Sequence, residues 1–84
     1  VTVRRLLSHT AGLSVQGYPG VHPDSQRPTL EESLAGVRGA EVRVLVAPGT
    51  LWRYSGGGYT LLELIVEERT GQTFADYMQQ AVLA

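Results

Sequence analysis

The residues best suited to chemistry lie together at positions 52–59, where a tryptophan, a tyrosine and a serine are followed by three glycines. Three consecutive glycines lose much backbone entropy when they become ordered. Such a run is either a flexible linker or a place where the backbone must approach another group closely. The flanking residues are rich in apolar and aromatic types, which argues against a linker. We therefore expect Tyr54, Ser55 and Gly56 to lie in a structured loop that carries the chemistry of this chain.

Several familiar uses of such a stretch do not fit this one. A phosphate-binding P-loop needs a lysine and a serine or threonine after its last glycine, whereas Tyr59 follows here. In the dinucleotide-binding pattern the third glycine would fall on Leu61. A nucleophile elbow around Ser55 would need glycine at the position of Arg53. The sequence instead predicts that Ser55 caps the helix that follows it.

Tyr54 and the two histidines are the remaining candidates for catalysis or metal binding. A free tyrosine is a poor base at neutral pH because its pKa is near 10, so it needs a cationic neighbour or a proton relay. From the residues alone, a packed aromatic role for Tyr54 is favoured over acid–base catalysis. His9 and His22 have no cysteine partner and match no metal-binding spacing, so no metal site is predicted. We expect His9 to bond nearby backbone at a helix end and His22 to be a solvated loop residue.

The elements that must position these residues are mainly helical. Apolar residues recur at helical intervals in several places along the chain. The predicted helices span about residues 3–10, 30–37, 57–70 and 74–83. Gly12 and Gly71 are expected to end the first and third of them in the left-handed conformation. Residues 13–28 have the composition of a long loop, which at this length is often functional or flexible.

Residues 41–47 do not follow the helical pattern. They alternate between polar and apolar types at first and then become apolar. This segment is either a β-strand or an extended stretch laid across the helical core. A turn at Pro48 and Gly49 is expected to close it.

The totals describe one small, partial domain over residues 1–84. The apolar fraction of 43% and net charge of -1 are ordinary for a globular protein, and no basic patch suggests nucleic acid as a partner. No apolar run is long enough to span a membrane, and without cysteine no disulfide can form. Val1 and Ala84 both lie within helical patterns, so we expect both ends to be cuts in a longer parent. The chain has no lysine, so a mechanism that needs one is incomplete here.

Three motifs, in order, resemble those of the serine β-lactamase and penicillin-binding-protein superfamily, in its class C, esterase and DD-peptidase-like branch. Residues 1–13, VTVRRLLSHTAGL, resemble that family's ITVRHLLSHTSGL segment. Residues 48–50, PGT, and 54–59, YSGGGY, resemble its PGT and YSNxGY motifs, and residues 61–74 resemble its LLGxIIExVTGxxF continuation. The resemblance covers nearly the whole chain apart from the middle loop.

The resemblance implies a fold and a chemistry. The family fold is an α+β sandwich with a helical subdomain, and these residues resemble a fragment of that subdomain. Its bacterial members attack an ester or amide carbonyl with the serine of a Ser-x-x-Lys motif and form an acyl-enzyme, without a cofactor. By position, Tyr54 falls on the family's proton-transfer tyrosine. The resemblance therefore implies that Tyr54 is a general acid and base, in place of the packing role that the residues alone favour.

The resemblance also implies where this chain departs from the family. Ser55 falls on the variable middle position of the Tyr-x-Asn motif, and Gly56 falls where the family usually has asparagine. Both are predicted to contact substrate, and the missing carboxamide favours an esterase or another hydrolase over a β-lactamase. His9 and Thr10 fall on a mainly structural segment and are not assigned a catalytic role.

The Ser-x-x-Lys motif is absent and the third motif is expected downstream. We therefore expect the 84 residues alone to be inactive, with the remainder of the parent chain and a small ester or amide substrate as partners. Periplasmic or secreted localisation is favoured by the resemblance. The alternative is a non-catalytic binding or scaffold domain.

Overall fold

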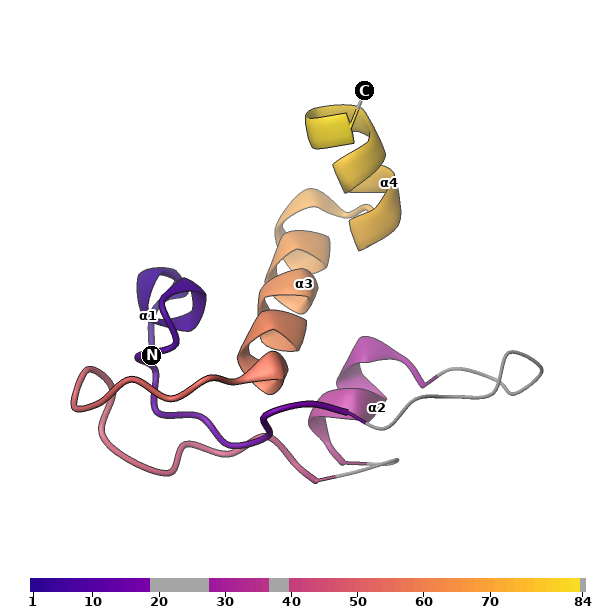
Figure 1. The fold of residues 1–84 in the computed structure, drawn as a ribbon. Coiled ribbons are helices and arrows are strands. Elements are labelled where there is room, and N and C mark those ends of the chain that lie inside the picture. The colour runs from indigo at the N-terminus through magenta and orange to yellow at the C-terminus, as the bar shows by residue number, and fades with distance from the viewer. Residues whose placement is uncertain (19–27, 37–39, 84) are drawn as a thin grey trace.

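The computed structural model describes residues 1–18, 28–36 and 40–83, and over these residues the chain is mainly α, as predicted (Figure 1). Its α-helices are α1 (Val3–Leu7), α2 (Leu30–Leu34), α3 (Gly56–Thr70) and α4 (Phe74–Met78), and a π-helical turn, η1 (Gln79–Leu83), continues α4. No β-strand forms in the described ranges. A single isolated antiparallel bridge joins Leu13 to Val44.

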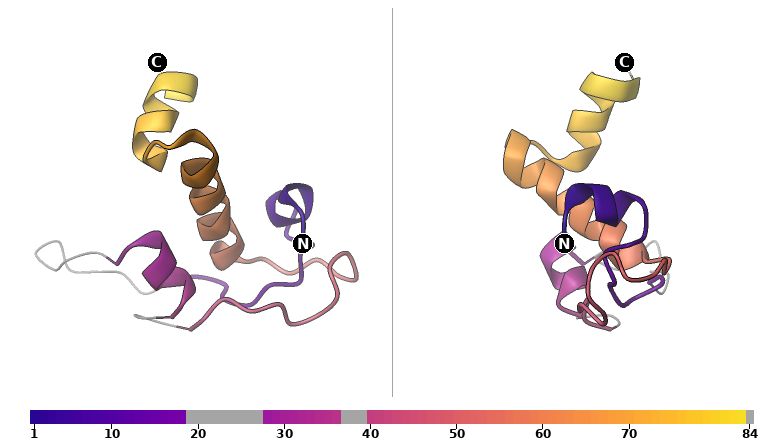
Figure 2. Two further views of the ribbon diagram at one scale, coloured as in Figure 1. Left: turned by 180° about the vertical axis from the view of Figure 1, so that it is seen from behind. Right: turned by 90° about the vertical axis from the view of Figure 1, so that its left-hand side faces the viewer.

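Helix α3 is the centre of the arrangement. It stands between α1 and α2, and α4 lies at its C-terminal end, while the extended segments cross near its N-terminus (Figures 1 and 2). Among the residues that the structure describes, the buried apolar side chains are few: Leu6, Ala11 and Leu13. Val42 and three residues of α3 pack against them half-buried, namely Leu61, Leu62 and Ile65. The core therefore joins α1, the segment after it and α3.

Hydroxyl side chains begin each α-helix in the described ranges. The capping residues, whose side-chain oxygens accept a backbone N–H of the first turn, are Thr2, Thr29, Ser55 and Thr73. Thr29 and Glu32 form a full capping box, because the Glu32 carboxylate also accepts the Thr29 N–H at 2.8 Å. Gly71 ends α3 at φ 71°, which confirms the predicted left-handed cap.

Two helices are shorter than the sequence pattern predicts. The pattern extends the first helix to residue 10, but α1 ends at Leu7 because His9 adopts the left-handed conformation at φ 59°. The second was expected to reach residue 37, but α2 ends at Leu34, and Gly36 at φ 84° turns the chain back so that the Val42 N–H donates to the Leu34 carbonyl. Residue 37 and the 19–27 part of the expected loop, with His22, lie outside the described residues.

The segment 41–47 is extended but forms no strand. Its backbone runs beside residues 12–14, where the Ser14 N–H donates to the Arg43 carbonyl and the Leu45 N–H to the Gly12 carbonyl, both at 2.7 Å. Of the two alternatives left by the sequence, the extended stretch across the core describes it better. Gly49, at φ 86°, forms the turn expected after this segment.

Candidate active site

Tyr54 lies at the end of the extended loop that leads into α3. It comes one residue before Ser55, the N-cap of the helix, and its side chain is 49% exposed. Hydrogen bonds fix the backbone on both sides of it. The Arg53 N–H donates to the His9 carbonyl at 2.8 Å, and the Ser55 N–H donates to His9 Nδ1 at 3.1 Å. Tyr54 therefore presents an accessible phenol from a fixed piece of backbone.

Ser55 is the most firmly held residue of the loop. It is 4% exposed, and its hydroxyl lies 2.8 Å from the Ser14 carbonyl oxygen and 3.1 Å from that of Val15, to which it donates. The same oxygen accepts the Gly58 N–H at 3.0 Å, so the predicted helix cap is confirmed. In this structure the hydroxyl fixes the loop, and a contact between it and a substrate would require these bonds to break.

The three glycines at the start of α3 use their N–H groups within the protein. Gly56 donates to the Gln16 carbonyl at 2.9 Å, Gly57 to that of Val15 at 3.1 Å, and Gly58 to the Ser55 hydroxyl. An anion at this helix N-terminus would have to displace those acceptors. The glycine run therefore serves close packing of residues 14–17 on the helix, which agrees with the rejection of a P-loop.

Gly56 shows the closeness of this packing most clearly. A Cβ atom at this position would lie 2.8 Å from the Gln16 carbonyl oxygen and 3.4 Å from the Gly17 Cα. Because these are backbone atoms, a side chain here requires the segment 16–17 to move. The Gln16 backbone carbonyl therefore lies in the space where a side chain at position 56, such as a carboxamide, would begin.

His9 brings the parts of the site together, and the sequence did not predict this. Its ring centroid lies 4.6 Å from that of Tyr54, 5.1 Å from Tyr59 and 5.6 Å from Trp52. Its Nδ1 bonds backbone 46 residues away rather than the nearby backbone that was expected. No local pattern signals such a contact, because it depends on how residues 9 and 55 meet in the fold.

Backbone strain accompanies the loop. Val15, a β-branched residue, has φ 62°, and His9 has φ 59°. Such conformations each cost about 1–3 kcal/mol and persist only where the surrounding structure holds them. The Val15 carbonyl accepts from both Ser55 and Gly57, and the His9 carbonyl accepts from Arg53. Both strained residues therefore hold the segment that carries Tyr54.

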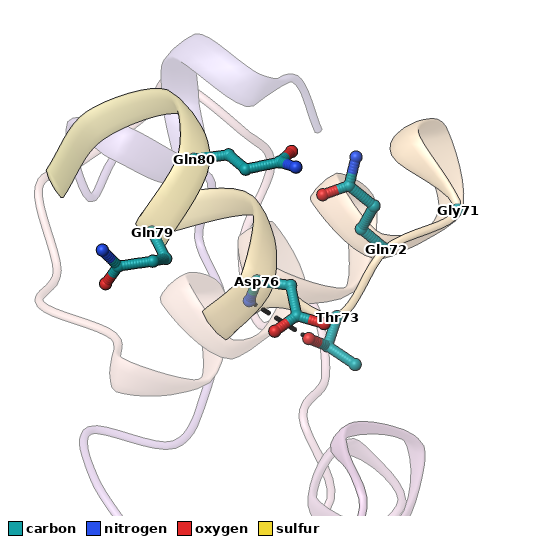
Figure 3. Close-up of a pocket in the computed structure, with 6 residues that line it drawn as sticks. All are labelled: Gly71, Gln72, Thr73, Asp76, Gln79 and Gln80. Carbon is teal, nitrogen blue, oxygen red and sulfur yellow. Dashed lines mark hydrogen bonds between the residues drawn. The ribbon is translucent and has the colours of Figure 1, made fainter. Parts of the chain in front are cut away.

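Other parts of the described chain offer less chemistry. A shallow hollow at the far end of α3 is lined by polar residues, with a single carboxylate among them, Asp76 (Figure 3). Burial raises the pKa of the Glu63 carboxyl above its usual range, and the Glu67 carboxylate adds to this effect. Within residues 1–18, 28–36 and 40–83 no group of three potential metal ligands comes together, and no helix there is both long and apolar enough to cross a membrane.

Two comparisons with known proteins match this chain. The family model described as Beta-lactamase matches residues 1–84. Penicillin-binding protein 4* of Bacillus subtilis (strain 168) is 31% identical over 84 residues, which cover 98% of this chain and 19% of that protein. The chain thus spans about a fifth of that relative's length. No solved structure matches the chain significantly.

Proposed function

The chain belongs to the β-lactamase family, and from this premise we propose that it is the segment of a serine hydrolase that supplies the proton-transfer tyrosine, Tyr54. The whole enzyme acts on an ester or amide through an acyl-enzyme. The nucleophilic serine belongs to a Ser-x-x-Lys motif in the rest of the protein, since this segment has no lysine. The segment alone is inactive for the same reason.

One observation carries the proposal, namely the way Tyr54 is held. The N–H groups of Arg53 and Ser55, on either side of Tyr54, both bond to His9, while the Tyr54 side chain is 49% exposed. A catalytic group needs a fixed origin and access to the reacting atoms. A tyrosine whose role was only packing would not need both.

The role of Tyr54 follows from the chemistry of acyl transfer. As the serine oxygen bonds to the carbonyl carbon, Tyr54 takes the serine proton, and it returns that proton to the leaving oxygen or nitrogen as the old bond breaks. Water then attacks the carbonyl carbon of the acyl-enzyme and gives its proton to Tyr54, which passes a proton to the serine oxygen as the acid is released. A tyrosine acts as a base in this way beside a cation, which we assign to the lysine of the absent motif.

Gly56 favours a simple ester as the substrate. Without a side chain at this position, the loop offers no carboxamide to bond the amide group of a peptide or a β-lactam. The backbone carbonyl of Gln16 lies where that side chain would begin. We therefore propose esterase activity ahead of penicillin hydrolysis, although the relative's name is that of a penicillin-binding protein.

The test compares two tyrosines in the full-length protein. Tyr54 and Tyr59 both contact the His9 ring and are 49% and 42% exposed, but the Tyr59 hydroxyl donates to the Leu7 carbonyl at 2.7 Å. We expect Tyr54→Phe to lower hydrolysis of p-nitrophenyl acetate by about 10²–10⁴-fold and Tyr59→Phe to change it less than about threefold. Wild-type turnover by Tyr54→Phe would disprove the assignment.

A binding or scaffold domain without catalysis is the second candidate, and the same Gly56 observation favours it. A domain that has lost the motif asparagine and filled its place with backbone has lost part of a substrate site. Labelling of the full-length protein with a fluorescent fluorophosphonate separates the two proposals. A labelled serine supports the hydrolase, whereas an unlabelled, folded protein without turnover supports the scaffold.

A further inference from the structure

We propose that His9 is a positioning residue for Tyr54, which rests on the proposed function of that tyrosine. His9 acts on Tyr54 through hydrogen bonds to the loop backbone and through contact with the tyrosine ring, and it makes no contact with substrate. Two backbone N–H groups and two aromatic rings of the loop, those of Trp52 and Tyr54, contact this single residue. The proposal follows from the geometry of those contacts.

The first element is a two-point clamp. The His9 carbonyl accepts from Arg53 at 2.8 Å and its Nδ1 accepts from Ser55 at 3.1 Å, so one residue binds the loop directly before and directly after Tyr54. The first bond holds the residue before Tyr54, and the second holds the peptide unit directly after it. Together they fix the direction in which the phenol leaves the backbone.

The second element is the ring itself. The His9 and Tyr54 centroids are 4.6 Å apart and their planes are inclined by 32°, a tilted ring contact that restricts the tyrosine side chain. Tyr59 contacts the same imidazole at 5.1 Å and ties it towards α1 through its bond to the Leu7 carbonyl. The orientation of Tyr54 is therefore linked to the end of α1.

The clamp requires a particular form of the imidazole. Because Nδ1 accepts the Ser55 N–H, it carries no proton, and the neutral ring must carry its proton on Nε2. A proton on Nδ1 would place two hydrogen-bond donors, Nδ1–H and the Ser55 N–H, against each other. The proposal thus predicts a tautomer as well as an effect on rate.

The left-handed backbone of His9 allows a sharp control. At φ 59° glycine is the residue with the least strain, so a residue that served only as a turn would be replaced by glycine without loss. Asparagine also tolerates this conformation, and its side-chain oxygen can take the place of Nδ1 as an acceptor. Phenylalanine keeps an aromatic ring but removes the acceptor.

The experiment measures kcat and KM on p-nitrophenyl acetate for His9→Asn, His9→Phe and His9→Gly in the full-length protein, with Tyr54→Phe alongside. We expect His9→Phe and His9→Gly to lower kcat by about 10–100-fold with KM changed less than about threefold, as for a displaced catalytic group. We expect His9→Asn to recover at least about tenfold of the His9→Phe loss. Circular dichroism of each variant checks that it is folded.

An independent measurement uses the unmodified protein. In a proton–nitrogen correlation spectrum of full-length protein labelled with ¹⁵N-histidine, we expect His9 at neutral pH to be the Nε2–H tautomer. An Nδ1–H tautomer would overturn the proposal even if a variant failed to fold.

The other outcomes are equally distinct. Full activity of His9→Gly, or equal losses in His9→Asn and His9→Phe, would overturn the positioning role of His9. The proposed function would still stand in that case, provided that Tyr54→Phe was inactive. A fully active Tyr54→Phe would instead overturn the proposed function.

Discussion

Alanine at Gly56 and alanine at Gly58 should have opposite effects on stability, although the two residues lie in the same turn of α3. At Gly56 the new Cβ would lie 2.8 Å from the Gln16 carbonyl oxygen. At Gly58 it would lie 3.5 Å from Leu6 Cδ2 and 3.6 Å from Leu13 Cδ1, which are ordinary contacts with the core. The chemical change is the same in both variants, and only the surroundings differ.

The magnitudes follow from these distances. Forcing an extra carbon against fixed backbone costs about 1–3 kcal/mol, and weakening the bond from Gly56 to Gln16 adds about 0.5–1.5 kcal/mol. Alanine in place of a helical glycine gains about 0.5–1 kcal/mol where it fits. We therefore expect Gly56→Ala to be less stable than Gly58→Ala by at least about 2 kcal/mol.

Urea unfolding of the full-length variants, followed by circular dichroism, measures the difference. The comparison needs only the gap between two variants, so errors of extrapolation largely cancel. Equal unfolding midpoints for Gly56→Ala and Gly58→Ala would refute the claim that residues 16–17 pack closely on the helix start. Gly56→Asn should then also be tolerated, and the argument from Gly56 to substrate class would fail with it.

The remaining predictions use the same unfolding assay. Ser55→Ala should lower the free energy of unfolding by about 1–3 kcal/mol, more than Thr73→Ala at the exposed cap of α4, and equal losses would argue against the buried network. Leu6→Ala should lower it by about 2–4 kcal/mol, whereas Leu7→Ala, 53% exposed, should stay within about 0.5 kcal/mol. Glu63→Gln should raise the melting temperature at pH 7 by roughly 1–2 °C. Since the pKa of Glu63 is raised on folding, its neutral form is favoured and the penalty appears only as pH rises through the folded-state pKa. A gain that persisted well below pH 4 would contradict that cause.

The helix caps show what the sequence alone could predict. The capping bonds of Ser55, Gly71 and Thr73 span three or four residues, so residue types and spacing were sufficient to predict the start and end of α3 and the start of α4. The mainly α class followed from the same local periodicity. The family motifs then predicted a proton-transfer role for Tyr54, whereas the residues alone favoured a packing role.

The contacts that arrange the site could not be predicted in this way. His9 ends α1 early because its left-handed backbone and its ring are fixed by residues 53–55, far away in the sequence. The Gln16 carbonyl accepts from the Gly56 N–H although the two residues lie far apart in the sequence. A sequence pattern reports local preference, whereas these positions are set by contacts between distant segments.

The clamp around Tyr54 also sets an order in which this region can form. His9 meets Ser55 across 46 residues, and Ser14 meets it across 41. Closing a loop of that length costs roughly 1.4 kcal/mol more than closing one of ten residues. A ribosome adds about 5–20 residues per second, so His9 waits for seconds before its partner is synthesised. During that interval the end of α1 is open to chaperones and proteases, and the loop at residues 52–55 takes its folded conformation only after it has been synthesised.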